Sequence, residues 1–120
     1  MIEVQTNDTA CRAGVANFVF LDRSGASTRA AFILDDDQPV EVTFRQHTGR
    51  MSFDVPLTPG THRCTVKIDA FFTPAPGETM NRLYNVAMNI DGAHVADASG
   101  AIAPDDVADS GLGSFTVTAA

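Results

Sequence analysis

A chain of 120 residues with 44% hydrophobic and 19% charged side chains is long enough and apolar enough to bury a core of its own. Its formal charge of −7 repels polyanions and argues against nucleic-acid binding. The length predicts a single domain over residues 1–120, and there is neither a transmembrane stretch nor a signal-peptide pattern, so we expect a soluble chain without a membrane partner.

The first third of the chain predicts three strands. We place them at IEVQT (residues 2–6), GVANFVFL (residues 14–21) and TRAAFIL (residues 28–34), the last two joined by the LDRSGAS turn. GVANFVFL carries apolar side chains on both faces. It is therefore predicted to be a central strand covered on both sides, or a strand at an interface.

The middle of the chain alternates between apolar and polar side chains with period two, the pattern of half-buried strands. Three runs show it: PVEVTFRQ (residues 39–46), GRMSFDVPL (residues 49–57) and the stretch over residues 63–72. The side chains predicted to point inward are Val40, Val42, Phe44, Met51, Phe53, Val55, Leu57, Cys64, Val66, Ile68, Ala70 and Phe72.

The last third predicts a hairpin, a loop and a final strand. Residues 84–90 alternate, Asp91-Gly92 supplies a tight turn, and the return strand carries Val95. The segment from Asp97 to Gly113 is rich in Ala, Asp, Gly and Ser, so we predict a long loop and the main candidate for a functional one. A strand with Phe115 and Val117 inward closes the sequence.

These elements predict an all-β fold, a single antiparallel β-sandwich of immunoglobulin-like or jelly-roll type with about eight strands. The run from Leu57 to His62, LTPGTH, resembles the L-x-P-G-x-H strand opening of bacterial immunoglobulin-like and fibronectin-like modules. The resemblance covers about a dozen residues. Its motif is a general one, because a Pro-Gly turn suits the start of a strand in any β-sandwich. It implies a β-sandwich and no activity.

His62 and Cys64 lie two residues apart on one predicted strand face, the spacing of a thiolate with a nearby base. The alternation makes Cys64 a core residue, and a buried cysteine is usually inert. We therefore expect a structural cysteine, with His62 at the mouth of the strand meeting solvent or a turn carbonyl. Cys11 and Cys64 could form one disulfide, and the sequence leaves this open. His47, His62 and His94 lack metal-ligand spacing.

Acidic loops supply the one candidate cofactor, calcium, which binds six to eight oxygen ligands. The candidate ligands are Asp97, Asp105, Asp106 and Asp109, with Asp35, Asp36 and Asp37 as a second cluster. Solvated carboxylates that keep the protein soluble are the alternative interpretation. Sugar binding by aromatic stacking is disfavoured, because the chain has no Trp and a single Tyr84. A calcium-dependent carbohydrate binder remains the alternative function.

Catalytic motifs of the G-x-S-x-G, phosphate-loop and H-E-x-x-H kinds are absent from the sequence, so we predict that the chain is not an enzyme. The leading hypothesis is a non-catalytic structural or interaction module: a subunit or decoration of a phage particle, a tail or a surface appendage. Its partners would be other protein subunits or further copies of the chain, in a virion or extracellular assembly. We predict Phe18, Phe20 and Phe71 at the interface, since one core explains them least; a second sheet or covering loop is the alternative.

Overall fold

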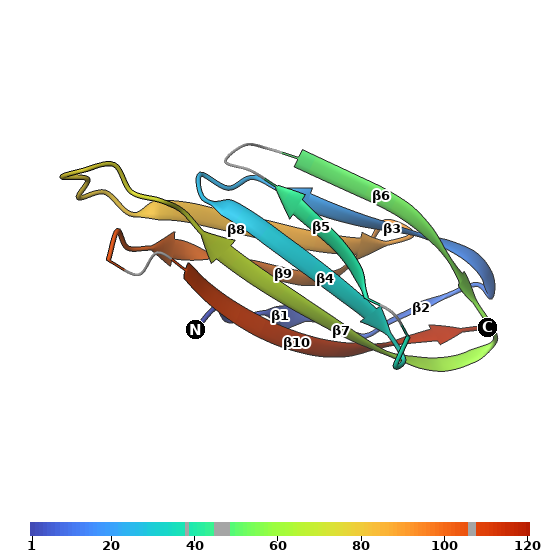
Figure 1. Cartoon of the computed structure of the whole chain (residues 1–120). Helices are drawn as coiled ribbons and strands as arrows, with labels where there is room; N and C mark the ends of the chain where they lie inside the picture. The colour runs from blue at the N-terminus through green and yellow to red at the C-terminus, as the bar shows by residue number, and fades with distance from the viewer. Residues whose placement is uncertain (38, 45–48, 106–107) are drawn as a thin grey trace.

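A computed structural model describes residues 1–37, 39–44, 49–105 and 108–120, and for Val42 the backbone alone. Within these residues the chain forms ten strands and no helix. The strands build two five-stranded sheets that pack against each other along their length (Figure 1). The predicted all-β sandwich is therefore confirmed.

The two sheets divide the strands as follows. The first sheet has the order β1 (Gln5–Thr6), β9 (Ala93–Ile102), β8 (Arg82–Ile90), β3 (Gly14–Asp22) and β6 (Gly49–Leu57). The second has the order β2 (Thr9–Cys11), β10 (Ala108–Ala119), β7 (Gly60–Phe71), β4 (Ser27–Leu34) and β5 (Val40–Phe44). Neighbouring strands are antiparallel except β2 and β10, which are parallel, so the prediction of a purely antiparallel sandwich is corrected at this pair.

The long loop predicted from Asp97 to Gly113 is wrong. Most of that segment belongs to β9 and to β10, which pairs with β7 from Ala108 opposite Phe71 to Ala119 opposite Gly60. The small and polar residues there have poor strand propensity, but pairing with the strongly alternating β7 overrides it. The predicted Asp91-Gly92 turn is confirmed: both residues have positive φ, 48° and 81°, in a tight turn between β8 and β9.

The glycines of β10 have a packing reason. A Cβ atom on Gly111 would overlap the carbonyl oxygen of Ile2, and one on Gly113 would lie 2.7–2.8 Å from side-chain carbons of Thr6 and Val4. The start of the chain thus crosses β10 so closely that a side chain does not fit beneath it. Glycine within a strand often marks such a close approach of another backbone.

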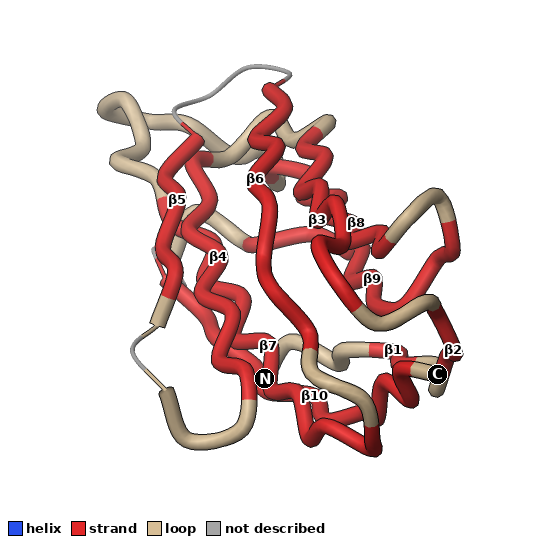
Figure 2. The backbone as a smooth tube through the Cα atoms, turned by 90° about the vertical axis from the view of Figure 1, so that its right-hand side faces the viewer, coloured by secondary structure: helices blue, strands red, loops and turns tan. Residues whose placement is uncertain are grey.

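The N-terminal segment, residues 2–11, ties the two sheets together along one side of the sandwich. The Ile2 N–H donates to the Ser110 carbonyl in the second sheet at 3.0 Å, and the Asn7 N–H donates to the Val95 carbonyl in the first at 2.8 Å. The segment then returns to the second sheet as β2. Figure 2 shows β1 and β2 far from β5 and β6, which border the opposite side. One side of the sandwich is therefore closed.

The core between the sheets contains two of the predicted interface residues. Phe18 and Phe20 are fully buried on β3, and the Phe18 ring meets Phe32 of the second sheet edge to face at 4.8 Å between centroids. Both side chains are unavailable to a partner, so the interface prediction is corrected for them. The second sheet covers the face of β3 that carries Phe18 and Phe20. On the opposite face Val19 is also buried, because it lies between the neighbouring strands β6 and β8.

Replacing Gly111 with alanine should push the N-terminal segment off β10. We expect Gly111→Ala to destabilise the fold by about 1–3 kcal/mol, the usual cost of overpacking, with faster amide exchange in residues 2–11. Gly113→Ala should cost less, because the atoms it meets belong to side chains that can rotate. Denaturant unfolding with hydrogen exchange measures both effects. Equal stability of Gly111→Ala and the wild type would contradict the packing argument.

Candidate interaction surface

His62 and Asp35 form a polar latch at one end of the second sheet. The His62 Nδ1–H donates to Asp35 Oδ2 at 2.9 Å, and Nε2–H donates to the Thr58 carbonyl at 2.7 Å. Asp35 has a positive φ of 53° in the turn after β4, and its Oδ1 accepts the N–H of Arg63 at 3.1 Å. The expectation that His62 meets a turn carbonyl is confirmed. Its role is to hold a turn in place.

The latch makes stability depend on pH. The hydrogen bond to Asp35, with that to Thr58, raises the pKa of His62, and the bond from His62 lowers the pKa of Asp35. A raised histidine pKa contributes stability that is complete below its ordinary value and is lost as pH rises through the raised one. A lowered carboxyl pKa contributes stability that is lost as pH falls. Both contributions are therefore present between about pH 4 and pH 6.5.

We expect His62→Gln to lower the melting temperature by a few degrees at about pH 5.5, and by clearly less once the pH exceeds the raised pKa of His62, where the ring of the wild type has lost its charge. Thermal unfolding across this pH range measures the difference. Asp35→Asn should show the same pH window, and the double variant should add little, because both changes break one interaction. A difference that is independent of pH would contradict the latch.

Cys64 is buried, as the alternation predicts, and both cysteines are free. Burial, with smaller effects from the charges of Asp35 and Cys11, raises the pKa of the Cys64 thiol to about 12. A thiolate is the reactive form of cysteine, so this thiol is not a nucleophile near neutral pH. Burial also raises the pKa of Cys11, which is only partly covered.

A thiol reagent applied to the folded protein at about pH 8 should leave Cys64 unmodified, because its thiol is both buried and protonated. Labelling in denaturant should modify it fully, which serves as the control. Mass spectrometry of peptides containing each cysteine reads the result. Labelling of Cys64 in the folded state as fast as Cys11 would contradict its burial.

The predicted calcium ligands do not converge. Asp97 lies on β9 of the first sheet, where its Oδ2 is 3.4 Å from His94 Nε2. Asp109 lies on β10 of the second sheet, where its Oδ2 is 3.1 Å from the amino nitrogen of Met1. Asp105 is exposed in the turn between these strands, and Asp106 lies outside the described residues, as does His47. Over the residues described, no group of three or more His, Cys, Asp or Glu side chains could hold a metal ion.

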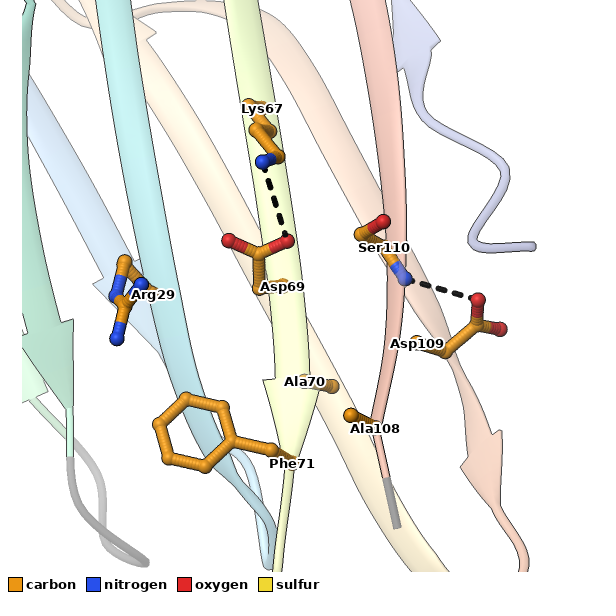
Figure 3. Close-up of a pocket in the computed structure, with 8 residues that line it drawn as sticks. All are labelled: Arg29, Lys67, Asp69, Ala70, Phe71, Ala108, Asp109 and Ser110. Atoms are coloured by element: carbon orange, nitrogen blue, oxygen red, sulfur yellow. Dashed lines mark hydrogen bonds and ion pairs between the residues drawn. The ribbon is translucent and has the colours of Figure 1, made fainter. Parts of the chain in front are cut away.

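Phe71, the third predicted interface residue, borders a shallow pocket of about 510 Å³ on the outer face of the second sheet (Figure 3). The Arg29 guanidinium lies 5.9 Å from the centre of the Phe71 ring, and Lys67 Nζ lies 3.9 Å from Asp69 Oδ1. These groups lie along β4 and β7, and Asp109 belongs to the pocket's β10 side. Arginine on an aromatic face with an ion pair alongside is ordinary surface packing, so the pocket defines no chemistry.

The opposite side of the sandwich is different in character: there β6 ends the first sheet. We call this the open edge, meaning the side of β6 (Gly49–Leu57) on which no strand of the described residues pairs with it, together with the inward side chains of β6. Met51 is 36% exposed, and Phe53 and Val55 are only partly buried, although the alternation directs all three inward. The Phe53 ring continues the aromatic core, 5.6 Å from Phe18 and 6.1 Å from Phe20. The core therefore reaches solvent at this edge.

The backbone of β6 also faces outward at alternate residues. The Asn17 N–H donates to Asp91 Oδ1 at 2.7 Å and its carbonyl accepts the Asp91 N–H at 2.8 Å, so both peptide groups of Asn17 point away from β6. Asp54 lies opposite Asn17, in a pair without mutual hydrogen bonds, and directs its N–H and C=O away from β3. By alternation Arg50 and Ser52 do the same.

Pro56 agrees with this direction. Pro56 lies two residues after Asp54, so its backbone nitrogen also points toward the open edge. The N–H that proline lacks therefore costs the sheet no hydrogen bond. Proline inside a strand is confined to edge strands and strand ends for this reason. The sequence carried this signal for β6, although alternation alone assigned Met51, Phe53 and Val55 to the core.

A comparison of the chain with protein-family models, with curated proteins and with solved structures gives no match in any of the three. In the part of the chain that the structure describes, no helix has the length and hydropathy that a membrane crossing requires. The function is therefore inferred from the geometry of the chain itself.

Proposed function

We propose that the chain is a non-catalytic interaction module, a subunit or decoration of a larger protein assembly, and that it joins its neighbours through the open edge. The observation that carries this proposal is the combination of outward peptide groups on Arg50, Ser52 and Asp54 with partly exposed inward side chains at Met51 and Phe53. An added strand would satisfy the first and cover the second.

Edge strands are normally protected, because a row of unpaired N–H and C=O groups invites pairing with another chain. Here the edges on the closed side are short, two residues in β1 and three in β2, whereas β6 has nine. Partners that add a strand to such an edge gain affinity from main-chain hydrogen bonds and specificity from alternate side chains. This supports β6 as the surface that contacts another subunit.

The shape of the molecule supports the same class of function. The chain is elongated, with principal extents of 54 × 22 × 22 Å, and β6 runs close to the long axis (Figure 1). A partner that pairs along β6 would therefore lie side by side with the sandwich. Such lateral contact suits a subunit of a particle, a tail or an appendage.

Proline at position 52 tests the open edge. Ser52→Pro removes an N–H that points outward, so it should abolish assembly while the β3–β6 ladder survives. Ser52→Ala is the matched control: both variants lose the hydrogen bond from Asn17 Nδ2 to Ser52 Oγ, and only the proline loses the N–H. Light scattering after size exclusion, with calcium and with chelator, measures the purified protein; cross-linking measures complexes in the native source.

Wild type and Ser52→Ala should form complexes larger than the 12.7 kDa chain in at least one of these settings, and Ser52→Pro should not. Calcium should leave their mass unchanged. A chain that is monomeric in both settings, or complexes that survive Ser52→Pro, would overturn the proposal. Equal melting temperatures of the two variants show that the proline variant is folded.

A further inference from the structure

We propose that the partner of β6 is β6 of a second copy of this chain, paired antiparallel with the two Ser52 residues opposite each other on a two-fold axis. This inference rests on the proposed function of the open edge and names its occupant. Two-fold interfaces use the same surface on both subunits, so the strand must be complementary to itself. Three properties of β6 meet that condition.

The first property is the direction of the peptide groups. Arg50, Ser52 and Asp54 all direct N–H and C=O toward the open edge, as the position of Asn17 requires. In an antiparallel pair centred on Ser52, each of these residues faces one of the same set on the other copy. Each facing pair exchanges two hydrogen bonds, so the three pairs form about six.

The second property is charge. In this register Arg50 of each copy lies opposite Asp54 of the other, which gives two symmetric ion pairs. Both side chains are exposed, and the described residues form no ion pair with either of them. Asp54 uses Oδ1 to accept from Asn17 at 3.1 Å, and Oδ2 is left for the second copy. The opposite-charge pairs favour this register over its neighbours.

Shifting the register shows how specific the match is. The peptide groups allow shifts of two residues only, since a shift of one would point them away from each other. One such shift sets Arg50 opposite Ser52, and the other sets it opposite Pro56, which has no N–H to give. Each of these shifts loses both pairs of Arg50 with Asp54.

The third property is apolar. On the inner face the register sets Met51 opposite Phe53 of the other copy, and this occurs twice by symmetry. These are two of the inward side chains that the single chain leaves partly exposed, at 36% for Met51. A thioether against an aromatic ring is a favourable contact, and covering both continues the core that contains Phe18. The first sheet of one copy and the first sheet of the other, each of five strands, would join into one continuous sheet.

Charge reversal tests the register. Arg50→Asp places like charges opposite each other at both sites, and Asp54→Arg does the same with positive charge, so each variant alone should dimerise at least about tenfold more weakly than wild type. An equimolar mixture of the two should regain the wild-type affinity, because one copy then presents two acidic and the other two basic side chains. The double variant Arg50→Asp/Asp54→Arg should dimerise like wild type. Sedimentation velocity over a range of concentrations measures all four.

A cross-link supplies a second measurement. Facing residues of a hydrogen-bonded antiparallel pair have Cα atoms about 5.5 Å apart, within the range that a disulfide spans. Ser52→Cys in a Cys11→Ser background should therefore form a disulfide-linked dimer on mild oxidation. Ser99→Cys, at an exposed position of β9 away from the edge, is the matched control and should not.

Three outcomes would overturn this inference: a wild-type chain that stays monomeric by itself, single variants that dimerise like wild type, or a mixture that fails to regain affinity. The proposed function fails separately. A purified chain that is monomeric, combined with complexes in the native source that Ser52→Pro abolishes, would remove the self-pairing and leave the open edge as a surface for a different protein. Complexes indifferent to Ser52→Pro would remove both.

Discussion

The passage of the N-terminal segment across β10 determines the form of this sandwich. Two sheets that pack face to face leave two sides where the core meets solvent and where edge strands have unpaired peptide groups. The segment closes one of these sides by bonding to Ser110 in one sheet and to Val95 in the other, and it reaches β10 because Gly111 has no side chain. The described residues contain one such segment, and they provide no equivalent on the side of β5 and β6. The open edge is the counterpart of the closed one.

Local pattern was sufficient for the strands in the middle of the chain and for which of their faces lie inward, but it did not predict β2 (Thr9–Cys11). Period-two alternation identified Cys64 as a core residue and Asp91-Gly92 as a hairpin turn, and both are confirmed. It failed between Asp97 and Gly113, because composition measures propensity, while the small residues there are required by a segment about a hundred positions away in sequence. Strand order is non-local in the same way. Without it, Phe18 could not be distinguished from an interface residue, nor Met51 from a core residue.

The candidate site depends on which residues of β6 direct their peptide groups to the open edge, and the sequence predicts this only in part. Pro56 marks β6 as an edge strand, but the direction of the peptide groups at Arg50, Ser52 and Asp54 follows from where Asn17 finds its partners, in the turn at Asp91. The aspartates illustrate the reverse case. Asp97 and Asp109 are close in sequence, yet β9 and β10 carry them into different sheets, where each has its own cationic or basic neighbour.

The pairing of β2 with β10 has a consequence for how the chain folds. Thr9 lies opposite Val117, so the second and the last strands of the described fold are partners, and the contact spans nearly the whole sequence. Contacts of such long range carry a high loop-closure cost and are typical of slowly folding β-proteins. During synthesis the side closed by the N-terminal segment must stay unsealed until β10 has left the ribosome. The nascent chain therefore leaves both sides of the sandwich open for most of its synthesis, and the completed chain leaves only the side of β5 and β6 open.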